Sequence, residues 1–313
     1  MSGIALRAGR RRGRGRSPVS SSPDRGIISA TEWRQRRIRW PVRLFHAATL
    51  IFLLVVGLGP VLWMIKSSVT PTQDTLRFPM ALWPNGIDLG QLATAWSRTH
   101  IDRYLWNTIV IAFGSWLAQI VVATTAGYAL SVLRPRGGGI LMGLVIATLF
   151  IPPIVLLVPL YLTIVDVPLV HARLIDNYWA IWLPAGASAV NVILMKRFFD
   201  NLPREVLDAA RVDGAGPLRL FRSVVLPMSG PILGVVSVFA VIATWKDYLW
   251  PLLVIRNPNL QPLSVRLPTL QPTTDLGTFI AALTLASIFP VVLFLVFQRL
   301  FLGGQGLSGA IKG

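Results

Sequence analysis

The sequence predicts an all-α membrane protein with six transmembrane helices and its N-terminus inside the cell. The first observation is composition: 53% of the 313 residues are hydrophobic and only 14% are charged, with a mean hydropathy of +0.61. A soluble domain has roughly 45–50% apolar and about 25% charged residues, so a lipid environment explains this chain better. The second observation is that the apolar residues gather into segments of membrane-spanning length. The third is the uneven distribution of Lys and Arg along the chain.

Six apolar segments are predicted to cross the membrane. Each holds about 18 or more mostly uncharged residues, enough for a helix rising 1.5 Å per residue to cross the ~30 Å hydrocarbon core. No segment carries a polar stripe wide enough for one helix face to meet water. In chain order the predicted spans are Leu44–Met64, Trp106–Leu133, Ile140–Leu162, Tyr178–Met195, Gly230–Val254 and Phe279–Phe297.

Residues 1–42 are predicted to form a disordered, Arg-rich cytoplasmic tail. Of the 30 Lys and Arg that give the chain its net charge of +17, twelve lie between Arg7 and Arg43. A segment rich in Arg, Gly, Ser and Pro buries too little apolar surface to order itself. Such a tail binds either nucleic acid or the anionic headgroups of membrane lipid. Lipid is favoured and no nucleic acid is expected, because no aromatic side chain stands among the arginines before Trp33.

The remaining positive charge orients the predicted spans. Lys and Arg favour cytoplasmic loops, and after the tail they are most concentrated between Lys196 and Arg222. This loop, between the fourth and fifth spans, is therefore predicted to be cytoplasmic. The expected organisation is a first span with an outer loop at 43–103, a core at 104–302 and a cytoplasmic C-terminal tail at 303–313.

The third predicted span contains the unusual stretch FIPPIVLLVP. Pro152, Pro153 and Pro159 each remove a backbone donor and disturb a helix. Lipid tolerates this only where neighbouring helices or water satisfy the freed carbonyls, so the span is expected to face protein or a cavity. A static kink and a bend that moves during gating both remain open.

The cytoplasmic loop contains the most polar ordered stretch, LPREVLDAARVDGAGPLRLFRSVVLP. Asn201 is expected to cap a short helix, with Pro203 in its first turn. Gly214 is expected to end that helix, and Pro217 to begin a second one. In the second helix, Leu218, Phe221 and Val225 fall at roughly helical spacing. The prediction is therefore a helix, a tight turn and another helix.

The stretch DAARVDGAGPLRLFRSVVLP resembles the EAA loop of ABC importer permeases. An acidic residue, two alanines, a glycine, an aliphatic residue and Leu-Pro fall in register, at Asp208, Ala209, Ala210, Gly214, Val224, Leu226 and Pro227. The departure is Asp208, where that family usually has Glu. The likeness covers nearly everything after Tyr104, and TWKDYLWPLLVI together with the terminal GLSGAIKG resembles the carbohydrate-uptake branch, of the maltose and glycerol-phosphate type. A second departure is Lys246, where that branch often has Asn.

The resemblance implies a core of five helices that forms half of a translocation path in a bacterial inner membrane, with a coupling loop at 198–228. It implies as partners a second permease subunit in a heterodimer, two copies of a cytoplasmic ATP-binding subunit, and an extracytoplasmic solute-binding protein. ATP and Mg would be bound by the partner ATPase, with no cofactor in this chain. The residues implied in coupling to the ATPase are Glu205, Asp208, Ala209, Ala210, Asp213, Gly214, Ala215, Leu218, Phe221 and Pro227.

Catalytic and metal-binding motifs are missing from the sequence. No G-x-x-x-x-G-K-[ST] loop is present to cradle phosphates, so nucleotide must be handled by another chain. Without cysteine, H-E-x-x-H or G-x-S-x-G, the chain offers no thiolate metal site, zinc motif or nucleophile elbow. A membrane enzyme or assembly factor is the less favoured alternative, since it would gather acidic residues or histidines at one depth.

Lys246 and Asp247 are the only charges well inside a predicted span, beside Trp245. Charge inside the bilayer is costly, so these side chains either snorkel to the interface, which is favoured, or line the translocation path. The candidate path residues are Pro152, Pro153, Asn191, Trp245, Lys246 and Asp247. The resemblance to the carbohydrate-uptake branch implies a carbohydrate as the solute, either an oligosaccharide or a related polyol; glycerol phosphate or another small solute is the alternative.

Overall fold

The computed structural model describes residues 36–302, which form helices and connecting turns. Most of the predicted Arg-rich tail and the whole of the tail at 303–313 lie outside the described residues. The chain divides into two compact units, Met1–Val61 and Leu62–Gly313, and helix α1 runs across their boundary. The helices are α1 (Arg36–Ser68), α2 (Thr72–Arg77), α3 (Gly90–Arg98), α4 (Ile101–Tyr128), η2 (Ala129–Leu133), α5 (Gly138–Thr148), α6 (Pro153–Val165), α7 (Trp179–Gly186), α8 (Ala189–Asp200), α9 (Arg204–Val212), α10 (Pro217–Leu220), η3 (Phe221–Val225), α11 (Leu226–Met228), α12 (Gly230–Trp245), α13 (Leu249–Val254), η4 (Pro258–Leu260), α14 (Leu263–Leu270), η5 (Gln271–Thr273) and α15 (Leu276–Leu302).

The first span begins earlier than predicted. Helix α1 starts at Arg36, so residues 36–42 are helical and do not belong to a disordered tail. Arg is a good helix former, which allows the helix to continue beyond the apolar segment. Side chains from Leu44 to Val56 are exposed along this helix, as expected where the solvent is lipid rather than water.

Three helical stretches are long and apolar enough to cross a membrane unbroken: Trp40–Ser68, Ile101–Leu133 and Leu276–Leu293. Three further spans are possible if each sharply bent helix pair counts as one, giving up to six. The bends are 106° between α5 and α6, 44° between α7 and α8, and 80° between the α10–α11 segment and α12. The predicted count of six is therefore reached only with bent spans.

Proline and serine explain two of these breaks. Pro152 and Pro153 follow residues 149–151, where α5 has ended, and Pro153 begins α6 because its ring fixes a φ suited to a first helical turn. Between α7 and α8, the Ser188 side chain accepts a 3.4 Å hydrogen bond from the Asn191 backbone N–H and caps α8. The third predicted span is thus two helices at a sharp angle instead of one kinked helix.

The fifth predicted span is also broken, and its first helix is shorter than the predicted segment. Helix α12 ends at Trp245, and residues 246–248 separate it from the short helix α13. The placement of Lys246 and Asp247 inside a spanning helix is therefore wrong. The Asp247 carboxylate accepts hydrogen bonds from the backbone N–H groups of Tyr248 and Trp250, and this local bonding competes with helix continuation.

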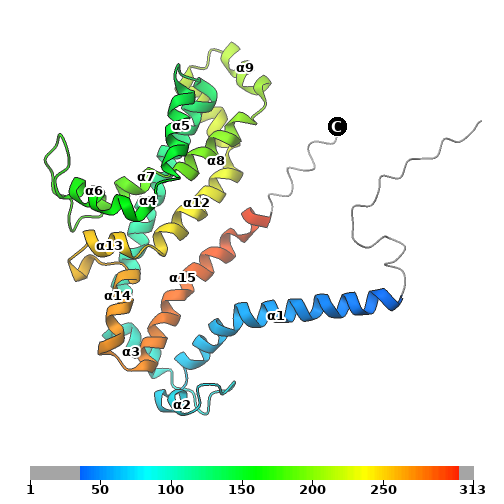
Figure 1. Cartoon of the computed structure of the whole chain (residues 1–313), viewed down its shortest axis with the longest axis vertical. Coiled ribbons are helices and arrows are strands. Elements are labelled where there is room, and N and C mark those ends of the chain that lie inside the picture. Colours follow the sequence, from blue (N-terminus) through cyan, green and yellow to red (C-terminus); the bar gives the residue numbers. More distant parts are fainter. Residues whose placement is uncertain (1–35, 303–313) are drawn as a thin grey trace, which may run out of the picture. The chain divides into compact units, whose positions relative to one another are not determined.

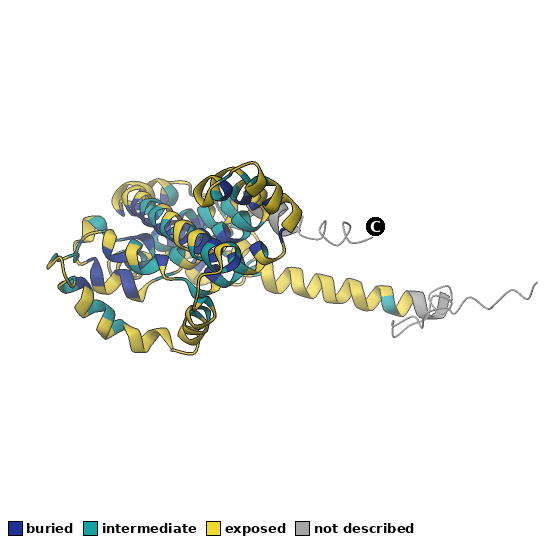
Figure 2. Ribbon diagram, turned by 90° about the horizontal axis from the view of Figure 1, so that it is seen from above, coloured by how far each residue is buried: buried dark blue, intermediate teal, exposed yellow. Residues whose placement is uncertain are grey.

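Helix α4 lies at the centre of the unit Leu62–Gly313, where it packs against α7, α8 and α12 (Figure 1). A Cβ at Gly127 would lie 2.9 Å from the Cβ of Met195, so only glycine lets α4 approach α8 this closely. In Figure 2 the buried residues of this unit lie on the inward sides of its helices. In Figure 1, α9 lies at one end of the unit, and α2 and α3, which belong to the predicted outer loop, lie at the other.

Candidate functional site

The segment that resembles the EAA loop forms a helix, a tight turn and a second helix, as predicted. Helix α9 begins after Pro203 and carries Glu205 in its first turn, where a negative charge meets the positive end of the helix dipole. Asn201 does not cap this helix. It ends α8 instead, donating a 2.7 Å hydrogen bond from its side chain to the Arg197 carbonyl.

Gly214 makes the tight turn. Its φ of +80° lies in the left-handed region, which glycine adopts without the steric cost that a Cβ brings. The Ala215 N–H donates to the Ala210 carbonyl at 2.9 Å and the Gly214 N–H to the Arg211 carbonyl at 3.0 Å, so these two carbonyls in the last turn of α9 are satisfied. Pro217 then begins α10, as predicted.

Helix α9 has one buried face and one free face. Leu207 is 7% exposed and packs into the largest core cluster, whereas Val212 is 87% exposed. Ala209 is exposed and Ala210 is half-buried against the same cluster, so the two alanines point to different sides. The free face, which we call the docking face, consists of Glu205, Val206, Asp208, Ala209, Val212 and Asp213.

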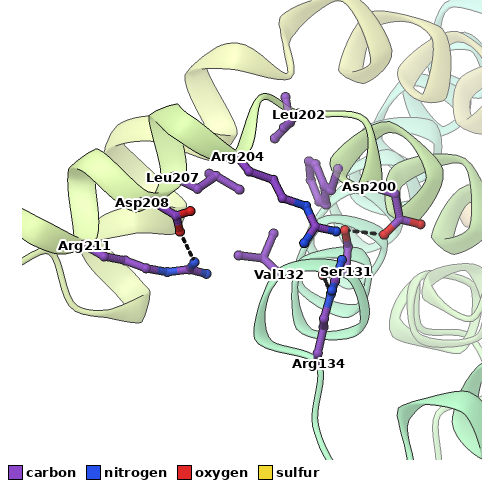
Figure 3. Close-up of a pocket in the computed structure, with 10 residues that line it drawn as sticks. Ser131, Val132, Arg134, Asp200, Leu202, Arg204, Leu207, Asp208 and Arg211 are labelled. Atoms are coloured by element: carbon purple, nitrogen blue, oxygen red, sulfur yellow. Dashed lines mark hydrogen bonds and ion pairs between the residues drawn. The ribbon is translucent and has the colours of Figure 1, made fainter.

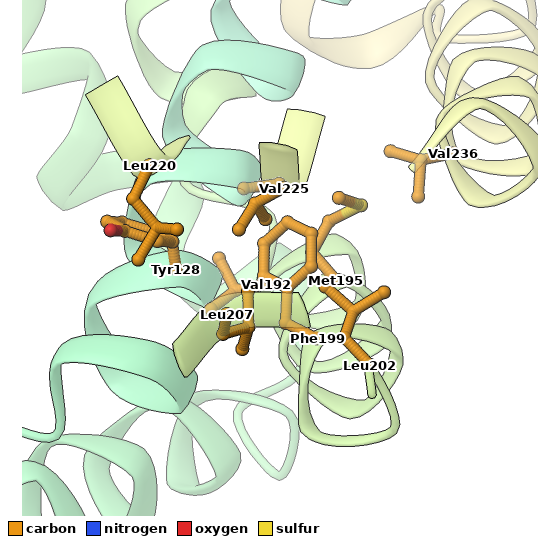
Figure 4. Close-up of a cluster of buried hydrophobic side chains, with 10 residues drawn as sticks. Tyr128, Val192, Met195, Phe199, Leu202, Leu207, Leu220, Val225 and Val236 are labelled. Carbon is orange, nitrogen blue, oxygen red and sulfur yellow. The ribbon is translucent and has the colours of Figure 1, made fainter. Parts of the chain in front are cut away.

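Side chains from α4 and α8 hold this segment in place. Leu207, Leu220 and Val225 are buried together with Tyr128 of α4 and Phe199 of α8 (Figure 4). The Tyr128 hydroxyl donates a 2.8 Å hydrogen bond to the Pro217 carbonyl. The Tyr128 ring also lies 4.9 Å, centroid to centroid, from the Phe221 ring.

Two π-helical turns, η2 and η3, flank this contact. They continue α4 and α10 respectively, and each inserts extra backbone that rotates the residues after it. In α10, which precedes η3, Leu220 is buried while Leu218 is 61% exposed, because residues two positions apart lie on nearly opposite faces of a helix. The predicted stripe of Leu218, Phe221 and Val225 is therefore only partly internal.

A cavity of about 160 Å³ lies where α9 meets the ends of α4 and α8 (Figure 3). Arg211 pairs with Asp208 at 2.7 Å, and Asp200 accepts 2.7 Å hydrogen bonds from Ser131 and Lys196. Exposed ion pairs of this kind contribute little stability, so the apolar anchors hold the segment. The cavity is lined by Ser131, Val132, Arg134, Phe199, Asp200, Leu202, Arg204, Leu207, Asp208 and Arg211.

The predicted coupling residues divide into an exposed group and a half-buried group. Glu205, Asp208, Ala209, Asp213, Gly214, Leu218 and Pro227 are exposed, and Ala210, Ala215 and Phe221 are half-buried. Sequence reasoning missed Tyr128, Leu207 and Leu220. Leu207 was detectable from the sequence, because it is a large apolar residue one helical turn before Ala210 in the largely polar stretch REVLDAARVD.

A second cavity, of about 650 Å³, lies among α4, α6, α7 and the α12–α13 break. Pro153 and Asp247 line it, and Asn191 lies behind Gln119, which it contacts through a 2.8 Å hydrogen bond. Trp245 is elsewhere, stacked on Phe289 with centroids 4.3 Å apart. Pro152 and Lys246 are exposed and do not line this cavity. The structure thus brings only part of the predicted path together.

Within residues 36–302, no group of three or more His, Asp or Glu side chains is arranged to hold a metal ion. The polar groups of the second cavity suit hydrogen bonding to a solute, and the docking face suits contact with another protein.

The chain is similar to known transport proteins. Residues 119–303 match the model of the family described as binding-protein-dependent transport system inner membrane component. The sn-glycerol-3-phosphate transport system permease protein UgpE of Escherichia coli O1:K1 is 31% identical over 271 residues, covering 83% of this chain and 95% of that protein. The probable ABC transporter permease protein YurM of Bacillus subtilis is 28% identical over 282 residues, covering 88% of this chain and 91% of that protein.

The fold is similar to that of a solved transporter. One chain in the crystal structure of a bacterial ABC transporter involved in the import of the acidic polysaccharide alginate superposes with a TM-score of 0.75. The match covers 85% of this chain and 98% of that chain, at 22% sequence identity.

Proposed function

The chain belongs to the family of binding-protein-dependent transport system inner membrane components, and we propose on that premise that it forms half of a carbohydrate import path coupled to a cytoplasmic ATPase. As a member of this family it is a non-catalytic, multi-pass permease subunit of an ABC importer in the inner membrane. The solute, the coupling residues and the individual partners belong to the proposal.

The observation that carries the proposal is the anchored elbow formed by α9, Gly214 and α10. Its docking face is exposed, while Leu207 and Leu220 are buried against α4 and α8. A push on the docking face would move these helices as one body, because packed cores transmit displacement instead of absorbing it. We propose that the ATPase pair binds the docking face and uses this movement to switch the side to which the path opens.

The proposed orientation places the elbow and the N-terminus in the cytoplasm. The segment from Lys196 to Arg222 is rich in positive charge, which favours the cytoplasmic side. The outer-loop helices α2 and α3 lie at the opposite end of the same unit (Figure 1), in agreement with a membrane between them. The proposed partners are a second permease subunit, two copies of the ATP-binding subunit, which would hold ATP and Mg, and an extracytoplasmic solute-binding protein.

Two solute classes are supported by different observations. The motifs TWKDYLWPLLVI and GLSGAIKG, which resemble the carbohydrate-uptake branch, favour an oligosaccharide or a polyol. The name of the Escherichia coli relative favours sn-glycerol 3-phosphate. We propose the carbohydrate, because the lining of the second cavity contains an acidic side chain, Asp247, and no basic one.

Co-purification and coupled activity test the proposal. The complex purified from native membranes through this chain should contain an ATPase and a second permease. Ala209→Glu places a charge and extra bulk on the docking face and should reduce ATPase recovery at least fivefold. Ala93→Glu is the matched control, because Ala93 is also an exposed helical alanine but lies on α3. Equal ATPase recovery from both variants would refute the proposed docking.

A further inference from the structure

The second cavity has polar groups on one wall and apolar groups on the others. Its polar lining consists of Ser115 and Gln119 from α4, Thr244 from α12, and Asp247 from the break that follows. The apolar lining includes Trp250, whose indole N–H donates a 2.9 Å hydrogen bond to the Ala180 carbonyl. This bond fixes the ring, which leaves a rigid aromatic wall beside the polar groups.

The hydrogen-bonding capacity of the polar wall is partly unused. The Asn191 side-chain amide donates to the Gln119 side-chain carbonyl at 2.8 Å, and both residues are buried. This bond orients the Gln119 amide so that its two N–H donors remain for another partner. The hydroxyl of Ser115 is fully buried and has no hydrogen-bond partner among the described residues. Buried polar groups are normally paired, so an unpaired one at a cavity wall points to an absent partner.

The cavity lining contains an acidic side chain and no basic one. Asp247 is the only ionisable residue among the side chains that line the cavity; no Lys, Arg or His contributes. Its carboxylate is held in place by the backbone N–H groups of Tyr248 and Trp250. The neighbouring Lys246 is exposed and is not part of the wall. An anionic solute in this cavity would lose its water without gaining a cation, and it would also face the Asp247 carboxylate.

We propose that this cavity is a solute-binding site in the import path, and that it accepts neutral, hydroxyl-rich solutes and excludes anionic ones. Gln119 N–H groups and the Ser115 hydroxyl donate to solute hydroxyl oxygens, Asp247 accepts from solute hydroxyls, and Trp250 contacts the apolar face of a sugar ring. The inference rests on the proposed function. It separates this chain from relatives whose names refer to sn-glycerol 3-phosphate and to an acidic polysaccharide.

The absence of cysteine from the chain allows a test that does not require the solute to be known. Ser115→Cys places one thiol in the cavity of the complete importer complex, reconstituted in lipid vesicles. The probes are a cationic trimethylammonium-ethyl methanethiosulfonate and an anionic sulfonatoethyl methanethiosulfonate. Labelling is followed by the mass of this chain, with and without ATP and Mg, and each rate is divided by the rate for free mercaptoethanol.

The cationic probe should react on the order of tenfold faster than the anionic probe after this correction, because an unscreened carboxylate lies in the same wall. Adding Asp247→Asn should bring the corrected ratio to within about twofold of unity. A preference for the anionic probe, or a ratio that Asp247→Asn leaves unchanged, would overturn the proposed charge selection. Failure of both probes to react in every nucleotide state would show that Ser115 does not face an aqueous path.

A second measurement separates this inference from the proposed function. In the same vesicles, ATP hydrolysis is measured for the complex with Ala209→Glu and for the parent complex. If hydrolysis responds to Ala209→Glu but the labelling shows no cation preference, only the cavity assignment is wrong. If the cation preference is present but no ATPase associates with the complex, the cavity assignment stands and the coupling proposal is wrong.

Discussion

The Tyr128 hydroxyl, at the end of α4, donates a 2.8 Å hydrogen bond to the Pro217 carbonyl at the start of α10. This bond joins a central spanning helix to the segment just beyond the Gly214 turn. Since Pro217 is exposed, water can replace the lost donor, and the bond contributes to positioning more than to stability.

Tyr128→Phe should lower the amount of solute imported per ATP hydrolysed. The change removes the hydroxyl but keeps the ring that contacts Phe221, so the expected loss of stability is only about 0.5–1.5 kcal/mol. Import and hydrolysis are measured together in reconstituted vesicles. The matched control is Tyr178→Phe, which removes a 3.2 Å bond to the Leu260 carbonyl away from the elbow. Equal import per ATP for the two variants would contradict the positioning role.

Gly214→Ala should weaken the association of the ATPase with the complex. The backbone at Gly214 has a φ of +80°, and a Cβ there costs roughly 1 kcal/mol although no neighbouring atom lies within 4 Å. Gly214→Asn should restore part of the association, because Asn tolerates the left-handed region. Recovery of the ATPase is compared across the two variants, and a greater loss with Asn than with Ala would contradict the conformational explanation.

Gly127→Ala should lower the thermal stability of the complex, because the added Cβ would lie 2.9 Å from the Met195 Cβ and 3.0 Å from the Lys196 backbone nitrogen. Forcing packed helices apart typically costs 1–3 kcal/mol. Gly143→Ala on α5 is the control, since nothing lies within 4 Å of its added Cβ. That substitution should be neutral or stabilising by up to about 1 kcal/mol. The midpoint of thermal unfolding in lipid nanodiscs is measured for Gly127→Ala and for Gly143→Ala. Equal midpoints would contradict the close packing of α4 against α8 at Gly127.

Asp275 should make stability depend on pH in the acidic range. A hydrogen bond from the Thr278 backbone N–H, with further bonds from the Thr278 and Thr72 side chains, lowers the pKa of this exposed carboxylate below its usual 3.8. Because the folded pKa is depressed, the stabilisation is present at neutral pH and is lost as pH falls through the folded pKa. Asp275→Asn cannot titrate, so its unfolding midpoint should change less between about pH 5 and about pH 2.5. A steeper decline for the Asn variant would contradict this assignment.

Most of the helices could be predicted from the sequence, because their length and apolar content depend on local composition. The turn at Gly214 was also predictable, since glycine is the residue that best tolerates the backbone conformation there. The breaks were harder to place. The stretch FIPPIVLLVP indicated a disturbed helix, but the 106° bend between α5 and α6 depends on what these helices pack against. The end of α12 at Trp245 carried no proline or glycine signal.

The membrane-spanning class, the helix–turn–helix elbow and the family could all be predicted from the residues alone, because each depends on residue types at fixed spacing along the chain. The contact between Tyr128 and Pro217, and the cavity shared by Ser115, Gln119 and Asp247, became visible only in the folded chain. These residues come from separate helices, and side chains distant in sequence meet only through packing and through the bends at helix breaks. Packing against Tyr128 and Leu207 likewise determines that Leu220, and not Leu218, faces inward.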